Sequence, residues 1–108
     1  MSFQYLQLEQ RDQVATVWIN RAEMHNAFNT QVIEELHRCF SELNTRDDVR
    51  VVILAGRGKS FSAGADLNWM KEAGQASQAE NEADALKLAK MLQSLATLKQ
   101  PTIARVQG

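Results

Sequence analysis

A loop of small residues in the middle of the chain is the stretch best suited to chemistry, and backbone atoms would do that chemistry. It reads Ser62-Ala63-Gly64-Ala65-Asp66 and follows an apolar strand. Glycine adopts positive φ readily, so we expect Gly64 to have positive φ or to lie in close contact with a ligand. Its small neighbours let backbone N–H groups come close to that ligand. A loop of this kind at the carboxyl end of a strand can form a hole for an anion. The sequence therefore predicts a site that stabilises developing negative charge.

A phosphate-binding nucleotide loop is a competing interpretation, because Gly58-Lys59-Ser60 resembles the end of such a motif. That motif requires another glycine at position 53, and this position is Ile53, within the strand. The spacing excludes the motif. We interpret Lys59 as a solvated loop cation or a minor phosphate contact.

Three side chains elsewhere have types that catalyse reactions in other proteins. His25 lies in the connection that precedes the first helix, where a structural role is favoured over catalysis. His37 has no second ligand at metal-site spacing, so we predict no metal site there. Cys39 has no basic activator nearby in sequence, and a plain half-buried thiol is favoured as much as a nucleophile.

The first elements expected to position this loop lie in the amino-terminal half of the chain. Residues 49–55 are almost continuously β-branched or aliphatic, which predicts a strand covered on both faces. Residues 3–9 and 14–20 predict a hairpin with a polar turn at 10–13, and the second strand also looks covered on both faces. A helix capped by Asn29 or Thr30 should run to about residue 44. Its buried stripe is predicted to be Ile33, Leu36, Phe40 and Leu43.

The second half predicts two more helices and a last strand. A short helix should cover residues 67–71, followed by a small, polar and mobile flap at 72–76. Ser77 and Glu80 match a capping box, which begins a long helix that Pro101 prevents from continuing past residue 99 or 100. Its buried face is predicted to be Ala85, Leu88, Ala89, Leu92 and Leu95. Residues 102–108 should form a strand, which completes an α/β order of elements.

Composition narrows the class of protein. A chain of 108 residues is one domain at most, and 44% hydrophobic with 23% charged residues is typical of a soluble globular protein. The net charge of −1 argues against a nucleic-acid surface, and no stretch suggests a membrane span. Cys39 is the single cysteine, so no intrachain disulfide forms. The start has no targeting pattern, which predicts a cytoplasmic location.

Three stretches together resemble the crotonase, or enoyl-CoA hydratase/isomerase, family. They are residues 20–28, with Asn20-Arg21 and Asn26-Ala27-Phe28, then residues 59–67 and residues 99–108. They follow one another at the family's usual spacing and span nearly the whole chain. The resemblance implies that residues 1–108 are the amino-terminal part of a crotonase-like β-β-α superhelix. Within the family, the sequence looks most like members that act on branched or carboxylated acyl-CoAs, such as methylglutaconyl-CoA hydratase.

The resemblance also implies roles for individual residues. Ala65 would supply one backbone N–H of the oxyanion hole that polarises a thioester carbonyl, with Gly64 and Leu67 beside it. Ala63 and Asp66 would lie against the adenine end of coenzyme A, and Ala27 would line the pantetheine path. Asp66 has a second interpretation as a simple helix cap.

Partners and cofactors are implied in the same way. The ligand would be an acyl-CoA thioester of fatty acid metabolism, coenzyme A being part of the substrate and no separate cofactor being needed. The complete enzyme would be a homo-oligomer, a trimer or hexamer as in the family, with no nucleic acid and no membrane involved.

This sequence departs from the family pattern in two ways. The family's proline after Asn-Arg is Ala22 here, and its lysine before Asn-Ala is His25, so Arg21 is the nearest cation for the coenzyme phosphates. The second oxyanion donor and the acid/base residues of the family come after the position of Gly108. We therefore expect hydration of 2-enoyl-CoA by the parent enzyme but no activity from this chain alone. Double-bond isomerisation, a non-catalytic CoA-binding or assembly module and a purely structural domain remain alternatives.

Overall fold

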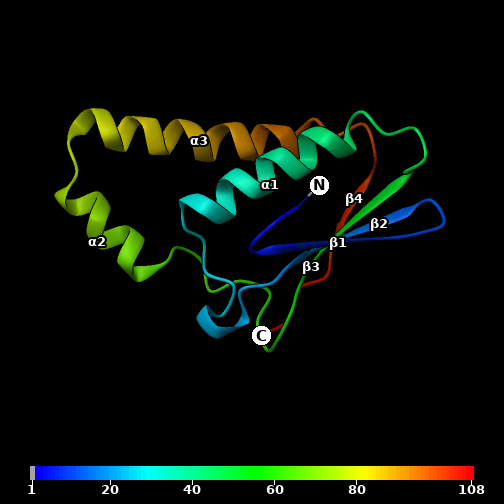
Figure 1. The fold of residues 1–108 in the computed structure, drawn as a ribbon, viewed down its shortest axis with the longest axis horizontal. Helices are drawn as coiled ribbons and strands as arrows, with labels where there is room; N and C mark the ends of the chain where they lie inside the picture. Colours follow the sequence, from blue (N-terminus) through cyan, green and yellow to red (C-terminus); the bar gives the residue numbers. More distant parts are fainter. Residues whose placement is uncertain (1) are drawn as a thin grey trace.

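Four strands form one sheet, and one helix covers a face of it. The computed structural model describes residues 2–108. Its elements are β1 (Leu6–Arg11), β2 (Val14–Ile19), the short 3₁₀ helix η1 (Ala22–Met24), α1 (Thr30–Leu43), β3 (Val51–Gly56), α2 (Leu67–Gln75), α3 (Gln78–Ala96) and β4 (Thr102–Ala104). The strands lie in the order β1-β2-β3-β4, with β1 antiparallel to β2 and the other pairs parallel. Figure 1 shows α3 running alongside α1, and the α/β class is confirmed.

The predicted hairpin is present, but its turn is shorter than expected. Arg11 pairs directly with Val14, so only Asp12 and Gln13 connect the strands. Asp12 has φ 55°, in the left-handed region that tight two-residue turns require and that aspartate tolerates. The turn predicted at 10–13 is wrong in its first two residues, because Gln10 and Arg11 belong to β1.

The core lies between the sheet and α1. The side chains of Ala15, Val17 and Ile19 are at most 1% exposed and belong to the same buried cluster as the stripe on α1. All four predicted stripe residues of α1 are buried, which confirms that helix. The opposite face of β2, with Val14, Thr16 and Trp18, is only half-buried. The expectation that both faces are covered is therefore wrong for this strand within residues 2–108.

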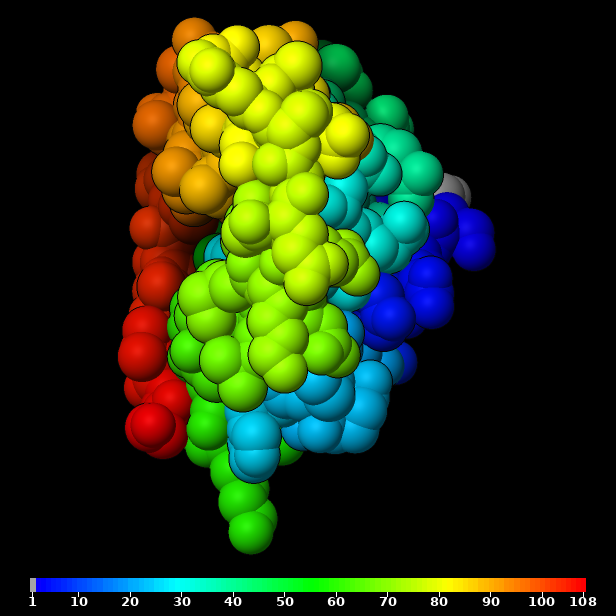
Figure 2. All heavy atoms as spheres, turned by 90° about the vertical axis from the view of Figure 1, so that its left-hand side faces the viewer, coloured from blue at the N-terminus to red at the C-terminus, as the bar shows by residue number. Residues whose placement is uncertain are grey.

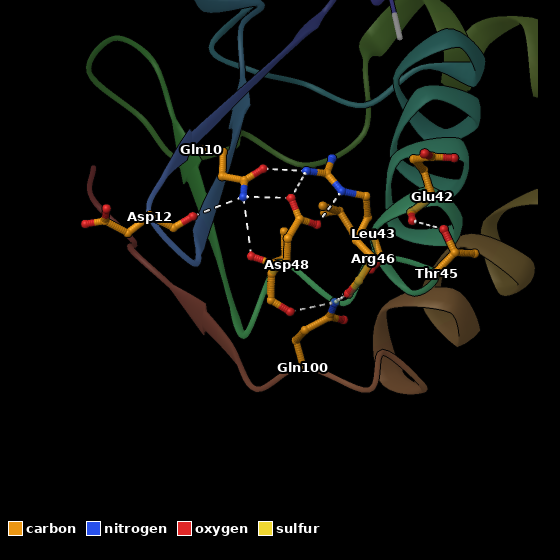
Figure 3. Close-up of polar contacts among 9 residues, drawn as sticks. Gln10, Asp12, Glu42, Leu43, Thr45, Arg46, Asp48 and Gln100 are labelled. Atoms are coloured by element: carbon orange, nitrogen blue, oxygen red, sulfur yellow. Dashed lines mark hydrogen bonds and ion pairs between the residues drawn. The ribbon is translucent and has the colours of Figure 1, made fainter.

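Polar side chains close both ends of α1. Asn29 caps the first turn, since its Oδ1 accepts a hydrogen bond of 3.0 Å from the Val32 N–H. At the other end the buried Gln100 donates to the carbonyl oxygens of Leu43 and Val49, at 2.7 and 3.2 Å. Figure 3 shows this contact beside the ion pair of Arg46 and Asp48. The chain before β3 is thus fixed to the helix that covers the sheet.

The second half differs from the prediction in three places. Residues 72–75, predicted as a mobile flap, form the last part of α2. Helix α3 begins as predicted, with Ser77 Oγ accepting from the Glu80 N–H at 3.1 Å, but its buried residue is Met91. Of the predicted face, Ala85, Ala89 and Leu92 are exposed, whereas Leu88 and Leu95 are partly buried. The predicted last strand is ordered as β4 over three residues only.

One physical reason explains why part of the predicted face of α3 is exposed. This helix packs against α1 and no other large element among the described residues, so a narrow strip suffices to make the contact. Leu88, Met91 and Leu95 form that strip, and Leu98, just after the helix, packs against the same core cluster. Leu86 and Leu92 of α3 are exposed, by 54% and 50%. None of the helices described combines the length and the apolar character needed to cross a bilayer.

Candidate functional site

Asn26 joins the connection after β2 to the loop after β3. Its side chain is fully buried, and its backbone has φ 56°. The Oδ1 atom accepts from the Arg21 N–H at 2.8 Å, and Nδ2 donates to the carbonyl oxygens of Arg57 and Ser60, each at 2.8 Å. The amide thus satisfies one donor and two acceptors from separate segments. Sequence reasoning placed Asn26 within a motif but predicted no role for its side chain.

A short parallel bridge then aligns the predicted loop with residues 25–28. The Ala63 N–H donates to the His25 carbonyl at 2.9 Å. The Phe28 N–H donates to the Gly64 carbonyl at 2.7 Å, and the Phe28 carbonyl accepts from the Asp66 N–H at 2.8 Å. In a parallel pair of this kind the residue between the two partners directs its own N–H and C=O away from the neighbouring segment.

That intermediate residue is Ala65, and its N–H is a free donor. No acceptor for it occurs among residues 2–108, and the residue is exposed at the surface of the loop. The preceding Gly64 has φ 90°, which confirms the predicted left-handed conformation. Apart from the two adjoining residues, no atom of the described chain lies within 4 Å of a Cβ placed at Gly64. The glycine is therefore required by backbone conformation, and the space beside it is open.

A groove brings most of the predicted site residues together. Its volume is about 670 Å³. The walls are formed by Glu23, Met24, His25, Ala27, Ala63, Ala65, Asp66, Leu67, Asn68, Met70 and Lys71. Figure 2 shows its two rims side by side, the light-blue segment after β2 below and the lime-coloured start of α2 above. Leu67 and Met70 are 70% and 47% exposed, so the groove offers apolar surface to a ligand.

Arg21 forms an ion pair with Asp66, which is one of the residues lining the groove. The Arg21 Nη1 lies 2.8 Å from Asp66 Oδ2 and also donates to the Ala27 carbonyl at 2.9 Å. The Asp66 Oδ1 accepts from the Trp69 N–H at 3.0 Å and so caps α2. The bond from the Trp69 N–H, followed by Arg21, holds the pKa of Asp66 below its ordinary value. The Arg21 guanidinium thus binds protein atoms here, and the capping interpretation of Asp66 is confirmed.

The other candidate side chains do not join the groove, with one exception. His25 lines it and also accepts the Ala63 N–H through its carbonyl oxygen. Cys39 is fully buried rather than half-buried, and burial raises the pKa of its thiol to about 12. A fully buried thiol that keeps its proton is a poor nucleophile, which favours the structural interpretation of Cys39. His37 lies on α1, away from the groove.

Comparison with known proteins identifies the family. The sequence model described as enoyl-CoA hydratase/isomerase matches residues 9–108. The short-chain-enoyl-CoA hydratase of Clostridium acetobutylicum is 37% identical over 102 residues, which cover 94% of this chain and 38% of that protein. The 4-chlorobenzoyl coenzyme A dehalogenase-2 of an Arthrobacter species is 32% identical over 106 residues, covering 96% of this chain and 38% of the relative.

Solved structures agree with the sequence relatives. The crystal structure of an enoyl-CoA hydratase from Shewanella pealeana superposes with a TM-score of 0.95 at 35% identity, covering 98% of this chain and 40% of that one. The chain thus spans about two fifths of the length of the proteins that it matches. It belongs to the enoyl-CoA hydratase/isomerase, or crotonase, family and has the fold of that family over the portion that it spans.

Proposed function

We propose that the groove beside Ala65 binds the thioester end of an acyl-CoA and that the Ala65 N–H donates a hydrogen bond to the thioester oxygen. The observation that carries this proposal is the free N–H of Ala65 at the wall of an apolar groove. Asn26 and the bridge to Phe28 hold the loop by short hydrogen bonds, so this donor needs no reorganisation when charge develops.

The chemistry that such a donor assists is common to thioester reactions. Addition to a 2-enoyl or aryl thioester moves electron density onto the thioester oxygen, and a fixed donor stabilises that charge. Relatives named as a hydratase and as a dehalogenase of a coenzyme A thioester match nearly the whole of this chain. This supports a role in binding and polarising the thioester, which both reactions require.

Hydration of a 2-enoyl-CoA is the reaction we favour, because several relatives carry hydratase names. Isomerisation of the double bond is the second candidate, since the family's description includes it. Among residues 2–108 the carboxylates that line the groove are Glu23 and Asp66, and Asp66 is already used by α2 and Arg21. A pair of carboxylates available for acid/base work is therefore missing from this groove, and we expect no turnover from residues 1–108 by themselves.

Calorimetry with acetyl-CoA tests the proposal without requiring turnover. Ala63→Trp places a large ring in the groove while keeping the backbone N–H that binds His25. Ala83→Trp is the matched control, because Ala83 is exposed on α3 away from the groove. We expect binding by the native chain, an affinity loss of about tenfold or more in Ala63→Trp, and no change in the control.

Two results would refute acyl-CoA binding at the groove. One is the absence of any binding heat with the folded native chain at millimolar acetyl-CoA. The other is equal affinity of the native chain and Ala63→Trp. A parallel enoyl-CoA hydration assay separates a catalytic chain from a module that only binds coenzyme A.

A further inference from the structure

The sulfur-containing side chains divide sharply by exposure. Among residues 2–108 they are Met24, Met70, Met91 and Cys39. Met91 is 2% exposed and Cys39 is fully buried, whereas Met24 and Met70 are 38% and 47% exposed. Both exposed methionines line the acyl-CoA groove. The accessible sulfur atoms of the described chain are therefore gathered at one place.

The two exposed methionines come from separate segments of the chain. Met24 is the last residue of η1, and Met70 lies on α2. Neither of these helices has a buried residue of its own. The segments that carry them form the two rims of the groove, which Figure 2 shows side by side. A change in the polarity of both thioethers would therefore alter the groove from both sides.

Oxidation of an accessible thioether by a peroxide produces such a change. One peroxide oxygen forms a bond to sulfur as the O–O bond breaks, the sulfur loses two electrons, and the other oxygen leaves as water. The resulting sulfoxide is polar, and burying its oxygen against an apolar ligand without a hydrogen bond is unfavourable. We propose that Met24 and Met70 form a reversible oxidation site at which a peroxide weakens ligand binding to the groove. The effect on binding rests on the proposed function.

The two buried sulfur atoms do not compete for the oxidant. A thiol reacts with peroxide as the thiolate, and burial raises the pKa of the Cys39 thiol to about 12. Met91 belongs to the buried core cluster, which keeps peroxide away from its sulfur. A brief exposure to peroxide therefore changes the groove and leaves the core intact.

Peptide mass spectrometry after brief exposure to hydrogen peroxide tests the modification site. In the folded chain we expect Met24 and Met70 to be oxidised about tenfold faster than Met91, or more. In urea the three rates should agree within about twofold, since folding alone protects Met91. Equal rates at the three methionines of the folded chain would overturn the proposal, whether or not the chain binds acetyl-CoA.

Calorimetry with acetyl-CoA, before peroxide is added and after it is removed, tests the effect on the groove. We expect oxidation to weaken binding by the native chain about tenfold. Methionine sulfoxide reductases with a dithiol should restore the affinity, because the sulfoxide oxygen leaves as water and the dithiol becomes a disulfide. The double variant Met24→Leu/Met70→Leu has no thioether in the groove, so peroxide should not change its own affinity. Met91→Leu is the matched control and should lose affinity on oxidation as the native chain does.

The possible failures are distinguishable. Unchanged affinity of the native chain after both groove methionines are oxidised would overturn the proposal and leave the proposed function intact. An equal loss of affinity in the double variant, or a loss that the reductases do not reverse, would also overturn it. Absence of acetyl-CoA binding by the untreated chain would refute the proposed function and the effect on binding together, whereas the oxidation rates would still decide the modification site.

Discussion

Arg21 and Asp66 form an ion pair of 2.8 Å that joins the end of β2 to the start of α2. Both side chains are buried, and each makes a further contact, since Arg21 donates to the Ala27 carbonyl and Asp66 caps the helix. Helix α2 has no buried residue of its own. Its position over the groove therefore depends on this pair and on Trp69, which packs against the core.

The pair should make stability depend on pH in the acid range. The pKa of Asp66 is lowered in the folded chain, so its contribution is fully present above the unfolded value of about 3.9 and is lost as the pH falls through the folded value. Asp66→Asn keeps a good cap but loses the charge. We expect it to lower the free energy of unfolding by about 2 kcal/mol at pH 7.

Urea unfolding of both chains between about pH 7 and pH 2 measures this effect. The difference between the native chain and Asp66→Asn should begin to shrink below about pH 4, where the carboxylate of the unfolded chain is protonated before that of the folded chain, and it should reach its minimum below the folded pKa. Asp47 and Asp48, whose pKa values are also lowered, are common to both chains and cancel in the difference. A difference that is constant with pH would show that the ion pair does not contribute.

Glycine-to-alanine variants should separate the stability cost of steric crowding from that of backbone strain. A Cβ at Gly56 would lie 2.6 Å from the Phe61 carbonyl oxygen, and we expect Gly56→Ala to cost about 3 kcal/mol. Gly64 has open space but φ 90°, so Gly64→Ala should cost about 1–2 kcal/mol from strain alone. Gly74 lies in α2 with open space, and Gly74→Ala should stabilise the chain by up to about 1 kcal/mol. Chemical denaturation gives all three values, and a different rank order would contradict the assigned causes.

Substitution of Asn26 should lower the stability of the chain far more than substitution of an exposed asparagine. Asn26→Asp replaces the Nδ2 donor by an acceptor that faces the carbonyl oxygens of Arg57 and Ser60, and we expect a loss of about 3 kcal/mol. Asn81→Asp on the exposed surface of α3 is the matched control and should change stability by less than about 0.5 kcal/mol. Similar values for the two variants would mean that Asn26 does not hold the loop.

The free side of β4 should cause self-association. All three of its residues are exposed, Ile103 by 54%, and Val106 beyond it by 74%. An uncovered edge strand with exposed apolar residues favours pairing between chains. Light scattering should show concentration-dependent growth in mass for the native chain, less for Ile103→Lys, and no reduction for Ala83→Lys on α3. A native chain that remains monomeric at high concentration would disprove this prediction.

The sequence predicted those elements whose signals are local. Examples are the buried stripe of α1, the Ser77 cap, positive φ at Gly64 and a cap at Asn29, which was one of two candidates. Each depends on spacing or on the chemistry of one residue, and all are present. The buried face of α3 was predicted only in part, with Leu88 and Leu95 correct, because burial there depends on a partner helix distant in sequence. Helical periodicity alone allowed several apolar faces on α3.

The polar contacts of the site were harder to predict for the same reason. The Asn26 side chain donates hydrogen bonds to backbone carbonyl groups of residues 57 and 60, and Arg21 pairs with the carboxylate of residue 66. These partners lie close only in the folded chain. Glu35 of α1 is a second example. Its side chain is buried, and its Oε1 accepts a hydrogen bond of 3.0 Å from the backbone N–H of Tyr5, which is distant in sequence. No local pattern marks such side chains, although asparagine in a loop before a helix is a weak signal for left-handed backbone.

The amide of Ala65 provides the most direct test of the proposed oxyanion donor. In a titration of the ¹⁵N-labelled chain with acetyl-CoA, we expect the Ala65 N–H to shift downfield and saturate together with the amides of Ala27 and Ala63. Ala65→Ser should bind with similar affinity, whereas Ala65→Pro, which lacks the donor, should bind about tenfold more weakly while remaining folded. An Ala65 amide that stays at its free position while acetyl-CoA saturates the groove would contradict the account.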